Sequence, residues 1–248
     1  MRPHALLLKF PGTNCDAETA RALQAAGFEA RILPFPLADR EQLAETDLVV
    51  LAGGFSYGDY IMAARLAQIE IETRLGDALH RFRDTGGHLL GICNGFQILM
   101  RLGLLPEGSL IENRQGRFVC RWVRLRNRAP SSPFLSRLPE TFELPIAHAE
   151  GRFVAAEAEV QRYLADGRAA LTYEEDVNGS LGAIAGLQDE TGRVFGLMPH
   201  PERFLTALDH PDRPPGTGDG PGSGYAFFAG IHDHIQAGRA ETAGEASR

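Results

Sequence analysis

The feature of this sequence that most constrains its fold is a series of short apolar segments that each stop at a glycine-rich or cysteine-bearing turn. Residues 5–10, 47–52 and 88–92 are almost continuously apolar, which is typical of strands buried on both faces of a parallel sheet. Helical patterns separate them, so the sequence predicts an α/β fold with an open, mostly parallel sheet flanked by helices. Right-handed crossovers place the carboxyl ends of these strands at one edge, where ligands bind in such sheets.

The second half of the chain has a different pattern. Apolar and polar residues alternate at 118–125 and 141–147, and a hairpin is expected around the turn at 189–192. The sequence therefore predicts a β-rich, antiparallel second half. The remaining expected elements are a strand at 28–33, helices at 61–83, 94–102 and 225–235, and a proline- and glycine-rich loop at 211–223.

The length of 248 residues suits a single domain at 1–236, followed by a polar, disordered tail at 237–248. The formal net charge of −7 argues against binding to nucleic acid or to an anionic membrane. No apolar stretch approaches the roughly 20 residues of a membrane span, so a cytoplasmic location is expected. Three cysteines without CxxC spacing argue against a disulfide framework and against a zinc site.

Cys93 lies between a predicted strand and a predicted helix, in the sequence Gly91-Ile92-Cys93-Asn94-Gly95. A strand that ends in Gly-x-Cys-x-Gly and continues into a helix is a nucleophile elbow, because the two glycines relieve crowding at the tight turn. The amino terminus of the helix offers free N–H groups and a positive dipole end, which favour a thiolate and can hold an oxyanion. A buried, inert cysteine is the alternative, and the glycine frame argues against it.

A cysteine nucleophile needs a base, and the base needs an orienting group. His200 and Glu202 follow a predicted strand in a segment that two prolines stiffen. Side chains two residues apart in an extended segment point the same way, so a contact between His200 and Glu202 is feasible. His148 and Glu150 form a second pair of this kind, and His148 is the main alternative for the base.

Gly53, Gly54 and Phe55 follow the strand expected at 47–52. Adjacent glycines let a backbone approach a ligand closely, so the N–H groups of Gly54 and Asn94 are candidates for an oxyanion hole. The alternative is an ordinary glycine-rich turn. The sequence has neither GxxxxGK[ST] nor GxGxxG after its first strand, so this chain itself is not expected to bind ATP or a dinucleotide.

The other two cysteines lack an elbow. Cys120 alternates with Phe118 and Trp122 on one face of a predicted strand, so a place in the core is expected for it. Cys15 is expected at a helix start, where the pKa of a thiol can be lowered, but the sequence indicates no base near it. We therefore expect Cys93 to be the nucleophile.

Five segments carry a resemblance to a known family. They are PGTNCD at 11–16, GGFSYGDY at 53–60, GICNGFQIL at 91–99, PIAH at 145–148 and GLMPHPER at 196–203. The elbow and the His-Pro-Glu motif resemble those of the class I, or triad, glutamine amidotransferases. The first two segments are similar to those of one family in the class, the glutaminase subunits of phosphoribosylformylglycinamidine synthase. The likeness runs from about residue 4 to Phe204 and resumes weakly in the last helix.

The resemblance implies a class I amidotransferase fold and an activity. Cys93 would hydrolyse L-glutamine to glutamate and ammonia through a thioester, with His200 and Glu202 completing the triad and the N–H groups of Gly54 and Asn94 holding the oxyanion. The residues that the resemblance implies for glutamine binding are Gln97, Gly53, Phe55, Arg117 and Phe118.

The resemblance also implies partners, and no cofactor in this chain. The ammonia would pass to a larger synthetase subunit that uses ATP and Mg. That subunit would convert formylglycinamide ribonucleotide to formylglycinamidine ribonucleotide in de novo purine biosynthesis. A small third subunit would bridge the two.

Three departures from the family pattern bear on these partners. Residues 61–64 are Ile-Met-Ala-Ala where the family usually has Leu-Arg-x-Gly, Ala149 follows His148 where glycine is common, and the insertion at 211–223 is unusual. None of them touches the expected triad. The alternatives are a class I amidotransferase subunit for a different acceptor, another cysteine hydrolase, and an interaction subunit without activity.

Overall fold

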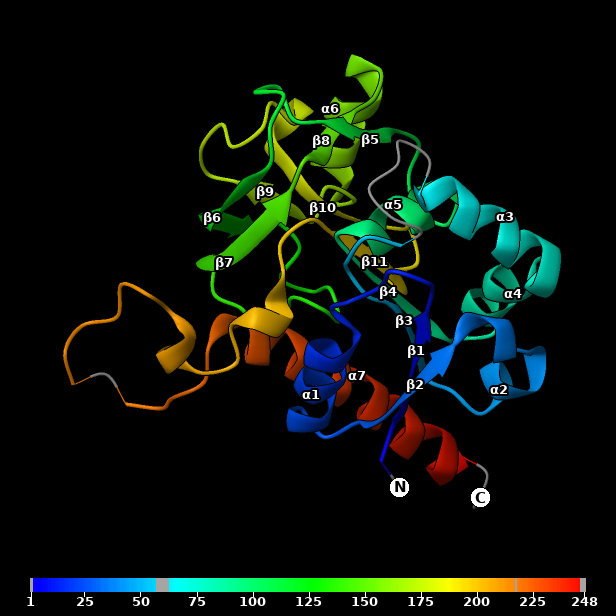
Figure 1. The fold of residues 1–248 in the computed structure, drawn as a ribbon. Coiled ribbons are helices and arrows are strands. Elements are labelled where there is room, and N and C mark those ends of the chain that lie inside the picture. The colour runs from blue at the N-terminus through cyan, green and yellow to red at the C-terminus, as the bar shows by residue number, and fades with distance from the viewer. Residues whose placement is uncertain (1, 57–62, 217, 246–248) are drawn as a thin grey trace.

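The structure is a computed structural model that describes residues 2–56, 63–216 and 218–245 (Figure 1). The expected helix start at residue 61 and residues 57–60 of the glycine-rich turn lie outside the described residues. Within the described ranges, no helix is both long enough and apolar enough to cross a membrane.

A nine-stranded sheet forms the centre of the molecule, in the order β2-β1-β3-β4-β11-β10-β9-β6-β7. Its strands are β1 (His4–Lys9), β2 (Glu29–Pro34), β3 (Leu48–Leu51), β4 (His88–Ile92), β6 (Val119–Asn127), β7 (Thr141–His148), β9 (Leu171–Tyr173), β10 (Ile184–Gln188) and β11 (Val194–Leu197). The pairs from β2 to β11 are parallel, and those from β11 to β7 are antiparallel. The predicted α/β fold, with a parallel first half and an antiparallel second half, is confirmed.

Helices cover both faces of this sheet. A Cβ on Gly196 of β11 would lie 2.2 Å from Phe96 of α5 (Asn94–Arg101), while the neighbouring Phe195 packs its ring 5.7 Å from that of Phe227 in α7 (Ser223–Glu245). Because successive strand residues point to opposite faces, α5 and α7 lie on opposite sides of the sheet. Helix α3 (Ala63–Leu75) contacts α5, and α1 (Asp16–Ala25) contacts α7.

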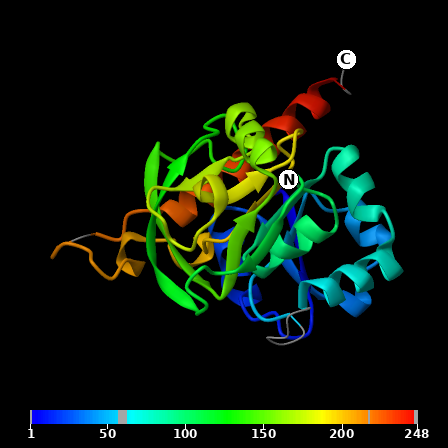
Figure 2. The ribbon, with the colours of Figure 1, turned by 90° about the horizontal axis from the view of Figure 1, so that it is seen from above.

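The remaining elements surround this core. They are α2 (Arg40–Ala44), α4 (Ala78–Asp84), α6 (Glu157–Asp166), the strand pair β5 (Ser109–Glu112) and β8 (Glu150–Val154), and the short 3-10 helices η1 (Phe35–Leu37), η2 (Leu181–Ala183), η3 (Pro201–Arg203) and η4 (Ala207–Asp209). Figure 2 shows the antiparallel strands and α6, in green and yellow, on the other side of the molecule from α3 and α4, in cyan and teal.

Two helices end at places that the sequence pattern did not indicate. The single helix expected at 61–83 is divided into α3 and α4, because Gly76 adopts φ +57° and its N–H donates to the Glu72 carbonyl, which ends α3. Helix α7 continues to Glu245, and its Arg239 forms an ion pair with Asp47 at 2.8 Å. The expectation of a disordered tail from residue 237 is therefore wrong for residues 237–245, which are helical. The single domain at 1–236 stays a prediction.

Candidate active site

Cys93 lies at the junction of β4 and α5, in the backbone conformation of a nucleophile elbow. Its φ of 53° and ψ of −106° are unusual for a residue other than glycine, and its N–H donates to the carbonyl of Leu197 in the neighbouring strand at 2.7 Å. The flanking glycines are needed for space, since a Cβ on Gly95 would lie 1.9 Å from the Leu51 oxygen and one on Gly91 would lie 2.6 Å from the Gly95 oxygen. The elbow that the sequence predicts is present.

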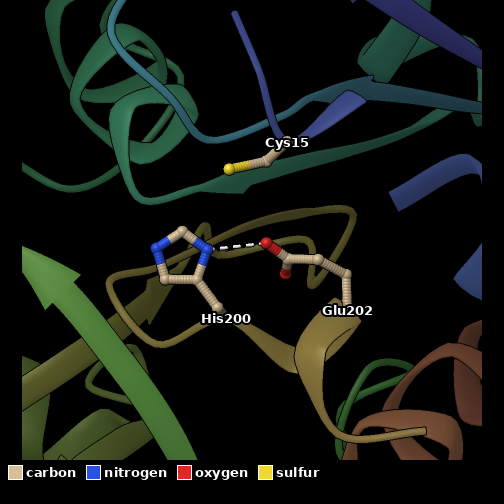
Figure 3. Close-up of side chains that lie close together, drawn as sticks. All are labelled: Cys15, His200 and Glu202. Carbon is tan, nitrogen blue, oxygen red and sulfur yellow. Dashed lines mark hydrogen bonds and ion pairs between the residues drawn. The ribbon is translucent and has the colours of Figure 1, made fainter. Parts of the chain in front are cut away.

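His200 and Glu202 follow β11, the strand that pairs with β4. The His200 N–H donates to the carbonyl of Pro145 in β7 at 2.8 Å, which fixes the backbone of the turn. His200 Nδ1 lies 2.6 Å from Glu202 Oε1, and the two side chains are 2% and 0% exposed (Figure 3). Because Nδ1 is held by a carboxylate, the other ring nitrogen, Nε2, is left for a substrate or a nucleophile.

The surroundings of His200 favour its charged form. Burial alone lowers the pKa of this imidazole, but the negative charges of Glu202 and Cys93, together with the nearby Cys15 thiol, outweigh burial and hold the pKa well above its usual range. A histidine in this state keeps a proton near neutral pH and can transfer it to a departing group.

A cavity of about 510 Å³ opens above Cys93 and His200. Its lining includes these expected site residues: Gly54, Phe55, Cys93, Asn94, Gln97, Phe118 and His200. Asn94 is the first residue of α5, so its N–H has no acceptor within the helix. The cavity therefore joins a thiol, a protonatable imidazole and a helix amino terminus, which is the set that acyl transfer requires.

Gly54 contributes to the same cavity through a backbone that only glycine can adopt. Its φ is +131°, and a Cβ there would lie 2.6 Å from the backbone nitrogen of Asn14. The neighbouring Gly53 lies beneath the site, where a Cβ would meet His200 Cε1 at 2.9 Å and Cys93 Cβ at 3.4 Å. The two glycines allow the first and third strand turns to pack directly against the candidate residues.

Some of the residues expected to bind glutamine line the cavity, and others do not. Gln97 is held by hydrogen bonds, accepting from Asn94 Nδ2 at 3.0 Å and donating to the Glu150 carbonyl at 2.7 Å. Phe55 and Phe118 are 42% and 49% exposed and lie at the cavity. Arg117 is not among the described residues that line it, and only its carbonyl is engaged, by Asn113 Nδ2 at 3.1 Å.

Cys15 is a residue of the site that the sequence reasoning set aside. Its sulfur, a nitrogen of His200 and a carboxylate oxygen of Glu202 all lie within 4.8 Å of one another, and Figure 3 shows the thiol pointing toward the imidazole. Arg203 Nη2 donates to this sulfur at 3.2 Å, so the thiol already has a cationic neighbour. Only the fold, which packs the turn after β1 against the turn after β3 and close to the turn after β11, would have revealed Cys15.

Cys120 lies at the cavity rather than in the core. It is exposed and lines the cavity together with Phe118, while Val123 and Leu125 of the same strand are the residues buried in the core. The core position expected for Cys120 is therefore wrong, because the alternation in β6 identifies two faces but not which of them is buried.

Comparison with known proteins identifies relatives over most of the chain. The family model for the CobB/CobQ-like glutamine amidotransferase domain matches residues 2–235. A Thermotoga maritima protein named phosphoribosylformylglycinamidine synthase subunit PurQ is 40% identical over 197 residues, which are 79% of this chain and 85% of the relative. A protein of the same name from Rhodopseudomonas palustris is 39% identical over 242 residues, which are 93% and 97% of the two chains.

Solved structures agree with this relationship. A chain in the structure of PurLQS from Thermotoga maritima matches with a TM-score of 0.77 and 37% identity, covering 95% of this chain and 100% of that one. A glutamine amidotransferase from Thermotoga maritima matches with a TM-score of 0.54 at 18% identity, covering 84% of this chain and 79% of that one. The second likeness shows the fold alone.

Proposed function

The chain belongs to the phosphoribosylformylglycinamidine synthase PurQ family of CobB/CobQ-like glutamine amidotransferases, and on this premise we propose how its residues act. Its function is that of the glutaminase subunit, which supplies ammonia from glutamine for formylglycinamidine ribonucleotide synthesis in purine biosynthesis. We propose Cys93 as the nucleophile, His200 as the acid and base, and Glu202 as the group that orients His200. The observation that carries this assignment is the buried 2.6 Å bond from Glu202 to a histidine beside the elbow.

The proposed reaction begins when the Cys93 thiolate attacks the carboxamide carbon of glutamine. A C–S bond forms, and the carbonyl oxygen becomes an oxyanion that the N–H groups of Gly54 and Asn94 bind. The C–N bond then breaks, and His200 gives its proton to the departing ammonia. Water loses a proton to His200 and attacks the thioester; the C–S bond breaks, glutamate leaves, and the Cys93 thiolate and protonated His200 are restored.

Substrate binding is proposed for the residues around the thiol. Gln97 lines the cavity, Gly53 lies beneath it against His200 and Cys93, and Phe55 and Phe118 are proposed to lie against the aliphatic part of glutamine at its opening. Arg117 is proposed to act through its backbone only, because its side chain is exposed and outside the lining residues that the structure describes.

The ammonia is proposed to pass to a larger synthetase subunit that uses ATP and Mg, with a small third subunit bridging the two. The likeness to a chain of the PurLQS structure supports such a complex. No cofactor is proposed for this chain. A cytoplasmic location is proposed as well, and the three free thiols fit a reducing compartment.

The two buried cysteines beside His200 provide the test of the nucleophile. In a complex reconstituted with the synthetase subunit, Cys93→Ala is expected to lower glutamine hydrolysis by on the order of 10³-fold or more, and Cys15→Ser by less than about tenfold. Ammonia release and trapping of the glutamyl thioester measure both. A Cys93→Ala complex that still hydrolyses glutamine, or a thioester found on Cys15, would show the assignment to be wrong.

A further inference from the structure

His148, at the end of β7, is a second buried histidine at the cavity, and the reaction described above does not use it. The residue is 3% exposed and lines the cavity together with Cys93 and His200. Its Nε2 has no hydrogen-bond partner among the residues that the structure describes. An unpartnered nitrogen that is buried against a cavity is costly in the empty protein and is available to a bound molecule.

Hydrogen bonds to Asn113 determine which ring nitrogen of His148 carries the proton. Asn113 Nδ2 donates to the carbonyls of His148 and Arg117 at 2.8 and 3.1 Å, so its Oδ1 is an acceptor. His148 Nδ1 lies 3.0 Å from that Oδ1 and must therefore be the donor. Nε2 of the neutral ring then carries a bare lone pair, on a residue that lines the cavity.

His148 and His200 differ in charge, because the pKa of His148 is lowered and that of His200 is raised. Burial, and then the positive charge of His200, lower the pKa of His148 to about 4. Its ring partner is a neutral amide, which does not stabilise an imidazolium as Glu202 stabilises that of His200. His148 is therefore neutral near pH 7 and can accept a hydrogen bond, while its lowered pKa makes it a much weaker base than His200.

The charges around the cavity indicate which donor His148 meets. Arg203 lies on the side of Cys15, whose sulfur its guanidinium contacts. Glu150 lines the cavity two residues after His148, at the start of β8. Gln97 is already engaged, by Asn94 and by the Glu150 carbonyl. His148 and Glu150 both line the cavity, so a neutral acceptor and an acidic residue are available there to a cationic group, while the positive charge of His200 is neutralised by Glu202.

Free glutamine carries such a cation, its α-ammonium group. We propose that His148 Nε2 accepts a hydrogen bond from the α-ammonium of glutamine, beside the Glu150 carboxylate, and so selects carboxamides that carry a free α-amino group. His148 is then a specificity-determining residue and takes no part in proton transfer to ammonia. This inference depends on the proposed glutaminase function.

Glutaramate, which is the same carboxamide acid without the α-amino group, separates binding of the ammonium from every other role. In the reconstituted complex, His148→Phe is expected to lower kcat/KM for glutamine by about 10- to 100-fold through KM, as loss of one hydrogen bond to a charged group implies. The weak activity on glutaramate is expected to stay within about twofold, because that substrate has no group for Nε2 to hold. His148→Gln offers a carbonyl oxygen near the place of Nε2. Its kcat/KM for glutamine is expected to lie between those of the wild type and His148→Phe.

Several results would overturn the inference. They are equal losses on glutamine and glutaramate in every folded variant, a fall in kcat with KM unchanged, and unchanged kinetics on glutamine. His80→Gln, in α4 and away from the cavity, is the matched control, and circular dichroism identifies the variants that fold. Failure of the proposed function is distinguishable, because the wild-type complex would then release no ammonia from glutamine at all.

Discussion

Gly53→Ala is expected to slow the glutaminase reaction without unfolding the chain. The φ of Gly53 lies outside the left-handed region, so an alanine backbone is tolerated there. The new Cβ would lie 2.9 Å from His200 Cε1, about 0.5 Å closer than the 3.4 Å at which ordinary contacts begin. His200 is 1% exposed and bonded to Glu202, so it can yield only by leaving its position. Since misplacement by about 1 Å can cost 10²-fold, we expect kcat/KM to fall by about 10- to 100-fold, or about 1.4–2.7 kcal/mol of transition-state stabilisation.

The assay is ammonia release from glutamine by the complex reconstituted with the synthetase subunit, with thermal melting measured in parallel. Gly218→Ala is the matched control, since a Cβ on Gly218 meets nothing within 4 Å, and its kinetics are expected to equal those of the wild type. A crowded core site costs about 1–3 kcal/mol, so a modest drop in Tm is compatible with the reasoning. Wild-type kcat/KM in a folded Gly53→Ala protein would refute it, because His200 would then not need its observed position.

Two further substitutions test the charge and the access of the site. Glu202→Gln is expected to lower kcat by about 10²–10⁴-fold, and because burial would then control the pKa of His200, the pH–rate profile should shift to lower pH. In the wild type the raised pKa of His200 stabilises the fold fully below its unfolded pKa of about 6.5, and this contribution is lost as pH rises through the folded value. Urea midpoints should therefore fall with rising pH in the wild type more than in Glu202→Gln, and parallel curves would contradict this. Because Cys120 is exposed while Cys93 and Cys15 are buried, a bulky maleimide should react with Cys120 first and block the cavity. Under the same maleimide treatment, Cys120→Ala should lose activity about tenfold more slowly than the wild type. Equal rates of inactivation would mean that Cys93 is the thiol attacked.

The parallel half of the fold was readable because its strands are buried on both faces and end at glycine-rich turns. The break between α3 and α4 was not readable, since Leu75 and Leu79 keep helical spacing across Gly76 and periodicity carries no record of φ. The extent of α7 was also missed. Its last turns are polar and look like a frayed tail, and the Arg239–Asp47 ion pair joins positions far apart in the chain.

The elbow and the His200–Glu202 contact were predictable because each lies within a few residues of sequence. Cys15 was not, since its place beside His200 depends on β1 and β3 lying next to each other in the sheet, which no local pattern states. The acceptor role proposed for His148 was equally hidden, because it follows from a hydrogen bond between this residue at the end of β7 and Asn113, 35 positions earlier in the chain. Contacts between residues close in the sequence could thus be predicted, and contacts between residues that only the tertiary fold brings together could not.

The pairing of β4 with β11 has a consequence for how the activity arises during folding. These neighbouring strands bring Cys93 and His200 together, and the Cys93 N–H is bonded to the Leu197 carbonyl. The chain between them is about 100 residues long, so this closure is slow compared with local helix formation. During synthesis the thiol therefore exists for some time without its imidazole, and the proposed catalytic pair is not assembled until β11 has joined the sheet. Reactivity toward glutamine is in this sense a late product of folding, acquired when the sheet is complete.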